Sequence, residues 1–162
     1  MRPDSGDIGA PQSVEFRAPA RYGFRVATLG ILIGQRQASE VLEQPDIYPV
    51  PNTPGWLRGL VNLRGNLVPV FDLAELLGLE REEDTASVKP MLLVVGKGEE
   101  ALGLIIEGFP RAIDLSRPLA ETPPLPDRLR DFHRGTYLDD SVVWLDIDLA
   151  RFVGSLSADM GT

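Results

Sequence analysis

The sequence predicts a mainly β protein in which two similar lobes with short helices pack together. The main observation is an internal repeat, because residues 58–78 align without a gap with residues 134–154, at a constant offset of 76 positions. Each copy reads as a strand, a polar turn, a second strand and a short helix, and a unit of this size cannot close a core alone. The other apolar runs are short and bounded by turn residues, which favours small barrels over open sheets.

The two copies match at positions that set local structure. Identical residues occur at Arg58 and Arg134, Gly59 and Gly135, Asp72 and Asp148, Leu73 and Leu149, Ala74 and Ala150, and Gly78 and Gly154. Asp72 is placed as a helix cap and Gly78 as a terminator, and Asp148 occupies the same cap position in the second copy. The repeat therefore predicts two equivalent units of a hairpin followed by a helix.

The first ordered element should begin near Tyr22. Residues 1–20 are rich in Pro, Gly, Ser and Asp and show no hydrophobic period, so we expect a disordered lead-in. Alternation over residues 22–29 predicts a strand, which residues 31–33 continue. Residues 35–43 fit either a strand or a short helical turn, and the prolines that follow exclude a long helix.

The first copy of the repeat is centred on a hairpin. Leu60 and Val61 read as one strand, residues 67–71 read as the next, and the sequence NLRGN between them reads as a tight turn. This turn places Arg64 at the tip, where a lone charge is either solvated surface or a contact for a partner. Gly65 beside it allows a positive φ that bulkier residues resist.

The second half of the chain is also rich in strands. Residues 80–90 form a charged loop, residues 91–95 and 102–106 read as strands, and the prolines of residues 116–126 indicate a linker or an extended arm. We expect a folded domain over residues 21–155, with lobe one over about 21–80 and lobe two over about 90–155. Residues 156–162 should form a flexible tail.

Composition narrows the class of protein. The chain has 162 residues, a net charge of −8 and no cysteine, so disulfides and thiolate metal sites are excluded. No basic stripe is present to bind nucleic acid, and no apolar run approaches the roughly 20 residues of a membrane helix. The N-terminus lacks the apolar region of a secretory signal, so the expected location is the cytoplasm.

The candidates for catalysis and cofactor binding have simpler structural explanations. His133 is the only histidine, which excludes a triad or a multi-histidine metal site, and we expect it at the surface or at a lobe edge. The sequence GKGEEA at residues 96–101 satisfies a dinucleotide-binding pattern, but a strand follows where a helix is required, which predicts a hairpin turn.

Acidic and aromatic residues also favour structural roles. Four aspartates could suggest a divalent cation site, but the repeat places three of them in a turn or at a cap; they are Asp139, Asp140, Asp146 and Asp148. The large aromatic residues are expected in the core rather than as platforms for bases; they are Trp56, Phe71, Phe109 and Trp144. No catalytic set, metal site or cofactor site remains, and the sequence indicates an interaction module.

The hairpin motif strongly resembles the CheW-like domain of bacterial chemosensory adaptors. The resemblance rests on residues 51–54, PNTP, and on residues 59–73, GLVNLRGNLVPVFDL. Further matches are SEVLE at residues 39–43 and GLIIEGF at residues 103–109. The resemblance covers about residues 22–155, and the NLRG block in this context is specific.

This resemblance implies a fold and a function. Family members have two five-stranded, SH3-like β-barrel lobes packed side by side, and they are non-catalytic scaffolds without a cofactor. They hold a CheA-type histidine kinase against the tip of a methyl-accepting chemoreceptor, with no membrane insertion of their own. Carried over by motif, Asn62, Arg64 and Gly65 would contact the receptor. The strand region with Ser39, Glu40 and Val41 would contact the kinase.

A narrower resemblance concerns the C-terminal half. The sequence from Pro123 to Leu145 looks like the PilI-like variant of type IV pilus, or twitching motility, systems. The sequence leaves open which signal or motility output is served. It also leaves a second function open, a ligand- or cofactor-binding enzyme of unknown reaction, which a search for kinase and receptor partners would separate from a scaffold.

Overall fold

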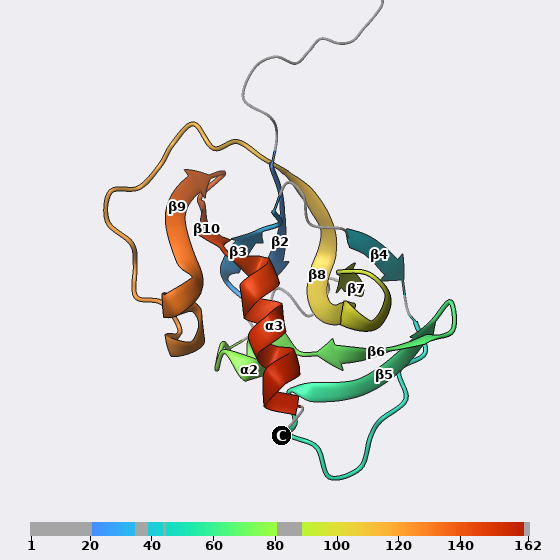
Figure 1. Ribbon diagram of the computed structural model, residues 1–162. Coiled ribbons are helices and arrows are strands. Elements are labelled where there is room, and N and C mark those ends of the chain that lie inside the picture. Colours follow the sequence, from blue (N-terminus) through green and yellow to red (C-terminus); the bar gives the residue numbers. More distant parts are fainter. Residues whose placement is uncertain (1–20, 35–38, 44, 81–88, 161–162) are drawn as a thin grey trace, which may run out of the picture.

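The computed structural model describes residues 21–34, 39–43, 45–80 and 89–160, and the predicted lead-in at residues 1–20 lies outside them. The strands are β2 (Arg21–Val26), β3 (Leu29–Leu32), β4 (Ser39–Glu43), β5 (Leu57–Leu63), β6 (Asn66–Phe71), β7 (Pro90–Val95), β8 (Leu102–Ile113), β9 (His133–Asp139) and β10 (Val142–Ile147). The helices are α2 (Leu73–Leu76) and α3 (Leu149–Met160), with 3₁₀ turns η3 (Gly98–Glu100) and η4 (Asp127–Phe132). The mainly β fold class is confirmed (Figure 1).

The strands form two lobes that share the long strand β8. In the first lobe the hydrogen-bonded order is β5, β6, β8, β7, β4, and in the second it is β8, β2, β3, β10, β9. The first half of β8 pairs with β6 and β7, up to the pair Pro90 and Glu107. The second half pairs with β2, from Arg25 opposite Glu107 to Arg21 opposite Ile113. Each lobe therefore has five strands, as expected, with one strand common to both.

The predicted division of the lobes in chain order is wrong. Strands β2 and β3 belong with β9 and β10, because β3 pairs in parallel with β10 through Gly30 and Trp144. Strands β7 and β8 belong with the first hairpin, because β6 pairs in parallel with β8 through Val70 and Gly103. Both parallel pairs join segments that are distant in the chain, and local patterns contain no information about such pairing.

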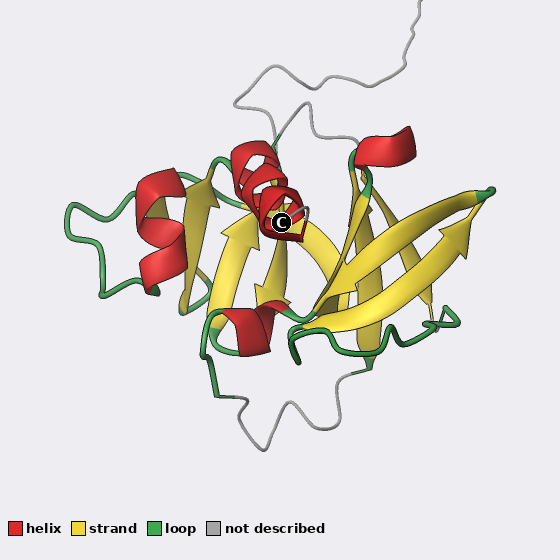
Figure 2. Ribbon diagram, turned by 60° about the horizontal axis from the view of Figure 1, so that its bottom comes forward, coloured by secondary structure: helices red, strands yellow, loops and turns green. Residues whose placement is uncertain are grey.

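The lobes are not closed barrels. Hydrogen bonding runs through all nine described strands as one sheet, and the end strands of each lobe do not pair with each other among the described residues. The sheet bends at β8, so that the two groups of strands lie on either side of it (Figure 2). Sharing β8 keeps the two groups in one sheet, which explains why two separate barrels do not form.

The repeat corresponds to equivalent structural units. The order β5, β6, α2 in the first copy is matched by β9, β10, α3 in the second. Both turns contain positive φ angles at aligned positions, 52° at Arg64 and 53° at Asp140. Asp72 accepts a hydrogen bond from the Glu75 N–H at 3.3 Å, and Asp148 accepts one from the Arg151 N–H at 3.1 Å, so both caps are confirmed.

The two helices end differently. Helix α2 has four residues, and Gly78 follows it with a φ of +69°. Gly154, which aligns with Gly78, lies inside α3, and that helix continues to Met160. The tail predicted to be flexible from residue 156 is therefore helical up to Met160. Leu156 is fully buried there, so α3 continues to pack against the core beyond the glycine that aligns with Gly78.

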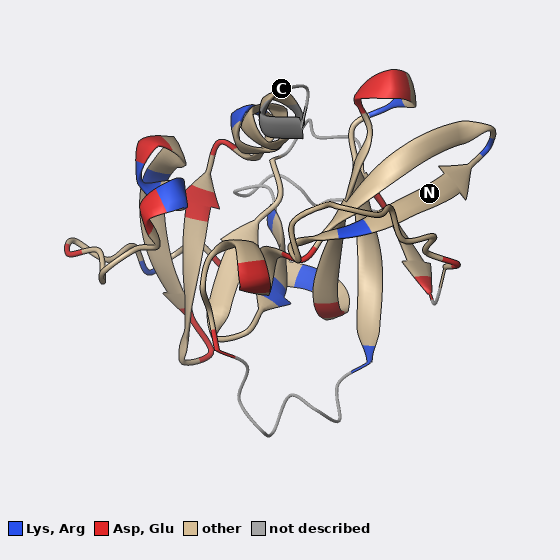
Figure 3. Cartoon of the chain, turned by 90° about the horizontal axis from the view of Figure 1, so that it is seen from below, with Lys and Arg blue, Asp and Glu red and all other residues tan. Residues whose placement is uncertain are grey.

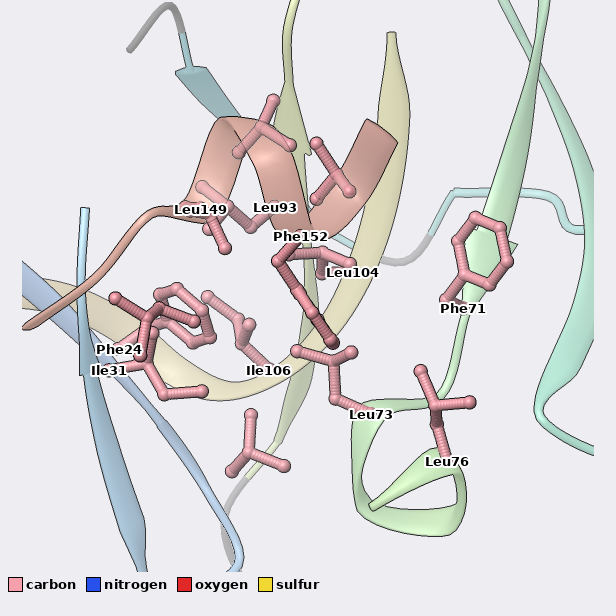
Figure 4. Close-up of a cluster of buried hydrophobic side chains, with 14 of the residues drawn as sticks. Phe24, Ile31, Phe71, Leu73, Leu76, Leu93, Leu104, Ile106, Leu149 and Phe152 are labelled. Atoms are coloured by element: carbon pink, nitrogen blue, oxygen red, sulfur yellow. The ribbon is translucent and has the colours of Figure 1, made fainter. Parts of the chain in front are cut away.

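The main core lies between the lobes and beneath α3. Figure 4 shows side chains of α3, α2 and the central strands converging on it; those labelled are Phe24, Ile31, Phe71, Leu73, Leu76, Leu93, Leu104, Ile106, Leu149 and Phe152. A second cluster lies under the first hairpin and consists of Val61, Val68, Val70, Leu92, Val94 and Ala101. Full burial of each such side chain stabilises the fold by roughly 1.5–3 kcal/mol.

The predicted aromatic core is mostly correct. Trp144 and Phe71 are fully buried, and Trp56 is half-buried and stacked on Phe71 with 5.7 Å between ring centroids. Phe109 is the exception, because its side chain is 63% exposed. It lies on the part of β8 that has left the first lobe, near an irregularity in the pairing with β2, so it does not reach either core.

The proline-rich segment at residues 116–126 is an extended arm along β9. The Leu119 N–H donates to the Thr136 carbonyl at 2.9 Å, and the Leu138 N–H donates to the Arg117 carbonyl at 3.0 Å. These bonds cover part of the outer edge of β9.

Within the described ranges, no helix has the length and apolar character needed to cross a bilayer.

Candidate functional site

The NLRG motif forms the tip of the β5–β6 hairpin. Arg64 and Gly65 occupy the turn with φ angles of 52° and 87°. The side-chain oxygen of Asn62 accepts a hydrogen bond from the Gly65 N–H at 3.0 Å. A Cβ at Gly65 would meet nothing within 4 Å, so the glycine serves the backbone conformation rather than a close contact. Asn62 and Gly65 therefore shape the turn that presents Arg64.

Arg64 contacts Glu40 across 24 residues of sequence. Its two terminal nitrogens donate to the two carboxylate oxygens of Glu40, each at 3.0 Å. The side chains are 69% and 36% exposed, and the hydrogen bonds to Glu40 raise the pKa of the Arg64 guanidinium above its ordinary value. The structure thus brings the predicted receptor contact and the predicted kinase contact together in one site.

The predicted kinase contact is strand β4, at the end of the first lobe. Ser39, Glu40 and Val41 pair with Val95, Val94 and Leu93 of β7. Ser39 is exposed, whereas Val41 is half-buried against the main core. The other edge of β4 has no strand partner among the described residues. Such an edge can accept a strand from another protein.

A groove of about 280 Å³ separates β4 from the hairpin tip. The pairing of Arg64 with Glu40 spans this opening, where the end strands of the lobe do not meet. Buried apolar side chains of Val68, Val94 and Ala101 form part of its lining. The exposed Lys97 of the β7–β8 turn adds a second cation at the groove. The arrangement is an apolar surface with a charged rim, which suits recognition of another protein.

The described lining of the groove holds no set of groups suited to catalysis. Among these lining residues, Ser39 is the only one with a hydroxyl group and Glu40 the only one with a carboxylate, and Arg64 binds that carboxylate. The sole histidine, His133, lies on β9 in the other lobe, where its Nε2 is 2.8 Å from the Thr136 hydroxyl. Among the residues with described positions, no three acidic or histidine side chains are grouped to hold a metal ion.

The dinucleotide-like pattern at residues 96–101 is a hairpin connection, as predicted. It joins β7 to β8, which pair antiparallel from Val95 opposite Leu102. A single 3₁₀ turn, Gly98–Glu100, replaces the helix that a phosphate site needs. The segment instead supplies Gly96, Lys97 and Gly98 to the wall of the groove.

The sequence analysis missed an ion pair at the base of the hairpin. Arg58 donates to the buried Asp72 carboxylate at 3.2 Å from Nε and 2.5 Å from its terminal nitrogen, and Glu75 lies 3.8 Å away. The bond to Asp72 raises the pKa of Arg58. The repeat contained a signal for this ion pair, because the two copies have arginine at the aligned positions Arg58 and Arg134. Arg134 also binds an acid near its strand, Asp146 at 3.4 Å.

Comparisons with known proteins agree on one family. A family model described as the CheW-like domain matches residues 22–156. Chemotaxis protein CheW of Thermotoga maritima is 27% identical over 110 residues, which cover 67% of this chain and 71% of that protein. Protein PilI of Pseudomonas aeruginosa is 27% identical over 117 residues, which cover 71% and 65%.

A solved structure has the same fold. The crystal structure of the scaffolding protein TtCheW from Thermoanaerobacter tengcongensis matches with a TM-score of 0.61 and 22% sequence identity. The match covers 82% of this chain and 90% of that chain. The shared fold therefore includes both lobes rather than one.

Proposed function

We propose, because this chain belongs to the CheW-like domain family, that it holds a CheA-type histidine kinase against a methyl-accepting chemoreceptor in the cytoplasm. The family consists of non-catalytic scaffolds, so the chain is a signalling adaptor of the chemotaxis or pilus type and not an enzyme. An enzymatic function is not favoured, since the one carboxylate among the described residues of the groove, that of Glu40, is paired with Arg64.

The observation that carries the proposed contacts is the ion pair between Arg64 and Glu40. It joins a hairpin tip, which extends from the sheet, to a strand edge, which is open to pairing. We propose that the receptor contacts the tip at Asn62, Arg64 and Gly65. The kinase contacts β4 at Ser39, Glu40 and Val41. Both proposed contacts therefore line one groove.

Arginine suits the receptor contact for a physical reason. Its planar guanidinium binds carboxylates or carbonyl groups with two parallel hydrogen bonds, and its charge is permanent. The second copy of the repeat has Asp140 and Ser141 at the equivalent turn, with φ angles of 53° and 63°. The fold therefore forms this turn without an arginine, which supports a role for Arg64 in binding rather than in folding.

Binding assays with purified kinase and with receptor-containing membranes test the proposal. Wild-type protein should bind both partners. Arg64→Glu should lose the receptor and keep the kinase, because it removes the cation at the tip and leaves the β4 backbone edge intact. Glu40→Lys should weaken kinase binding. Asp140→Arg, a charge reversal at the equivalent turn of the second lobe, is the matched control and should bind both partners normally.

A double variant separates the two roles of Arg64. Glu40→Arg combined with Arg64→Glu exchanges the members of the ion pair, so the link across the groove can form again. If the receptor contacts the Arg64 side chain directly, the double variant stays defective in receptor binding. Full recovery of receptor binding would show that only the ion pair matters, and loss of kinase rather than receptor by Arg64→Glu would contradict the assignment.

A further inference from the structure

Among the described strands, β4, β5 and β9 lie at edges of the sheet. An edge strand has unpaired backbone N–H and C=O groups, and proteins commonly cover such edges. Tyr48 covers the edge of β5, because it exchanges two backbone hydrogen bonds with Leu60, each 2.9 Å long. The arm covers the edge of β9 through the bonds at Thr136 and Leu138. No segment within the described ranges covers the edge of β4 in this way.

The pairing of β7 with β8 shows which way the backbone groups of β7 point. Pairs in an antiparallel ladder alternate between hydrogen-bonded and non-hydrogen-bonded ones. The Gly108 N–H donates to the Lys89 carbonyl at 3.1 Å, and the next residue, Pro90, has no N–H. Alternation from this pair makes every second residue of β7 bond to β8; these residues are Met91, Leu93 and Val95.

The same alternation extends to β4. Leu92 and Val94 bond away from β8, and they lie opposite Leu42 and Glu40, so Leu42 and Glu40 are the residues of β4 that bond to β7. The backbone groups of the other residues point to the open edge; these residues are Ser39, Val41 and Glu43. In the described part of the chain, no hydrogen bond outside the ladder uses these groups. The open edge is therefore a row of free donors and acceptors.

The fold already uses the central side chains of β4. Val41 packs against the main core, and Leu42 packs against the cluster beneath the hairpin. Arg64 binds the side chain of Glu40. The backbone edge, with an exposed residue at each end, is therefore the part of β4 that another chain can reach.

An unpaired strand edge selects an extended partner. A helix bonds its own backbone groups internally, whereas an added strand bonds to the edge along its length. A second copy of this chain is a poor candidate, because each copy has a net charge of −8 and acidic segments lie on both lobes (Figure 3). Two such copies repel each other. The proposed function supplies another partner, the kinase, whose contact it assigns to β4.

We infer that a strand of the kinase adds to the open edge of β4 and extends the sheet of the first lobe. Its backbone bonds to the N–H and C=O groups of Ser39, Val41 and Glu43. The inference rests on the proposed function and specifies its kinase contact. Backbone groups of β4 make this contact, with Val41 at its centre.

Hydrogen exchange of the isotope-labelled protein, free and bound to the purified kinase, tests the inference. In the free protein the Val41 amide should exchange fast and the Glu40 and Leu42 amides slowly, since only the latter two bond to β7. Kinase binding should slow exchange at Val41 about tenfold or more and leave Glu40 and Leu42 nearly unchanged. A contact made by side chains alone would not produce this alternation.

Proline substitution tests the same bonds through affinity. Glu43 is exposed, and Glu43→Pro removes an outward N–H that Glu43→Ala keeps. The proline variant should bind the kinase about three- to tenfold more weakly than the alanine variant, the size of one hydrogen bond. Both variants should keep wild-type receptor affinity and melting temperature. Leu42→Pro is the control for orientation, because it removes an N–H bonded to β7 and should lower the melting temperature.

Each other outcome overturns the inference. Unchanged exchange at Val41 in a kinase complex, or equal kinase affinity of the two Glu43 variants, means that no strand is added. Slow exchange at Val41 in the free protein means that the chain covers its own edge, and protection that grows with protein concentration assigns the edge to a second copy. Protection by receptor-containing membranes instead of the kinase assigns it to the receptor. If the wild-type protein binds no kinase, the proposed function itself fails, which distinguishes that failure from the others.

Discussion

Replacement of glycine by alanine should change the free energy of unfolding differently at three positions of this chain, raising it at one and lowering it at two. Gly59 in β5 has a φ of +145°, and a Cβ there would lie 2.3 Å from the Tyr48 carbonyl oxygen. Gly65 in the turn has a φ of +87°, and nothing lies within 4 Å of a Cβ. Gly154 lies inside α3 with open space around it. The chemical change is the same at each position, so any difference comes from the structure.

The structure sets the size of each effect. Gly154→Ala should stabilise the protein by roughly 0.5–1 kcal/mol, because alanine loses less conformational entropy in a helix. Gly65→Ala should cost about 1–2 kcal/mol, the strain of a left-handed conformation without a clash. Gly59→Ala adds backbone strain of about 1–3 kcal/mol to a clash of about 1–3 kcal/mol, for a total of roughly 2–6 kcal/mol. That clash also opposes both hydrogen bonds between Tyr48 and Leu60, each 2.9 Å long.

Urea unfolding followed by tryptophan fluorescence measures these differences. The expected order of unfolding free energies is Gly154→Ala, wild type, Gly65→Ala and Gly59→Ala, from highest to lowest. A Gly59→Ala variant within about 0.5 kcal/mol of the wild type would refute the reasoning, since that range is usual for surface changes. Destabilisation by Gly154→Ala would contradict the helical conformation of Gly154 and the continuation of α3 past it.

Further predictions concern the buried polar and aromatic groups. Asp72→Ala should lower the unfolding free energy by roughly 2 kcal/mol in urea titrations, because the helix cap and the charge-assisted bonds from Arg58 are lost. Asp72→Asn keeps a capping oxygen and removes only the charge, so it should cost less; an unfolding free energy equal to the wild type would argue against the ion pair. Trp144→Ala should cost about 3–5 kcal/mol by the same measurement, since the side chain is fully buried, and a smaller loss would mean that the site collapses. Thr136→Val should cost about 1 kcal/mol and increase amide exchange at Leu119, because the buried hydroxyl loses its contacts with His133 and Thr122; unchanged exchange would show that the arm does not depend on this hydroxyl.

Local features of the fold were predictable from the sequence. The hairpins, their turns and the caps at Asp72 and Asp148 depend on residues a few positions apart, and the repeat shows each of them twice. The NLRG motif indicated a turn with a positive φ and an outward arginine for the same reason. Backbone conformation, turn chemistry and capping are short-range effects, so a short stretch of residues contains the information that determines them.

Contacts between distant segments were decided by the tertiary structure. The chain order suggested a first lobe over residues 21–80, but parallel pairing of β3 with β10 places the N-terminal strands in the other lobe. Gly154 aligns with the predicted helix terminator Gly78, but α3 continues past it and buries Leu156 in the core. Arg64 and Glu40 were assigned to separate sites, and their pairing depends on how the first lobe curves. Burial and strand pairing between distant segments outweigh local propensity. These contacts form only when the chain folds, so short stretches of sequence do not reveal them.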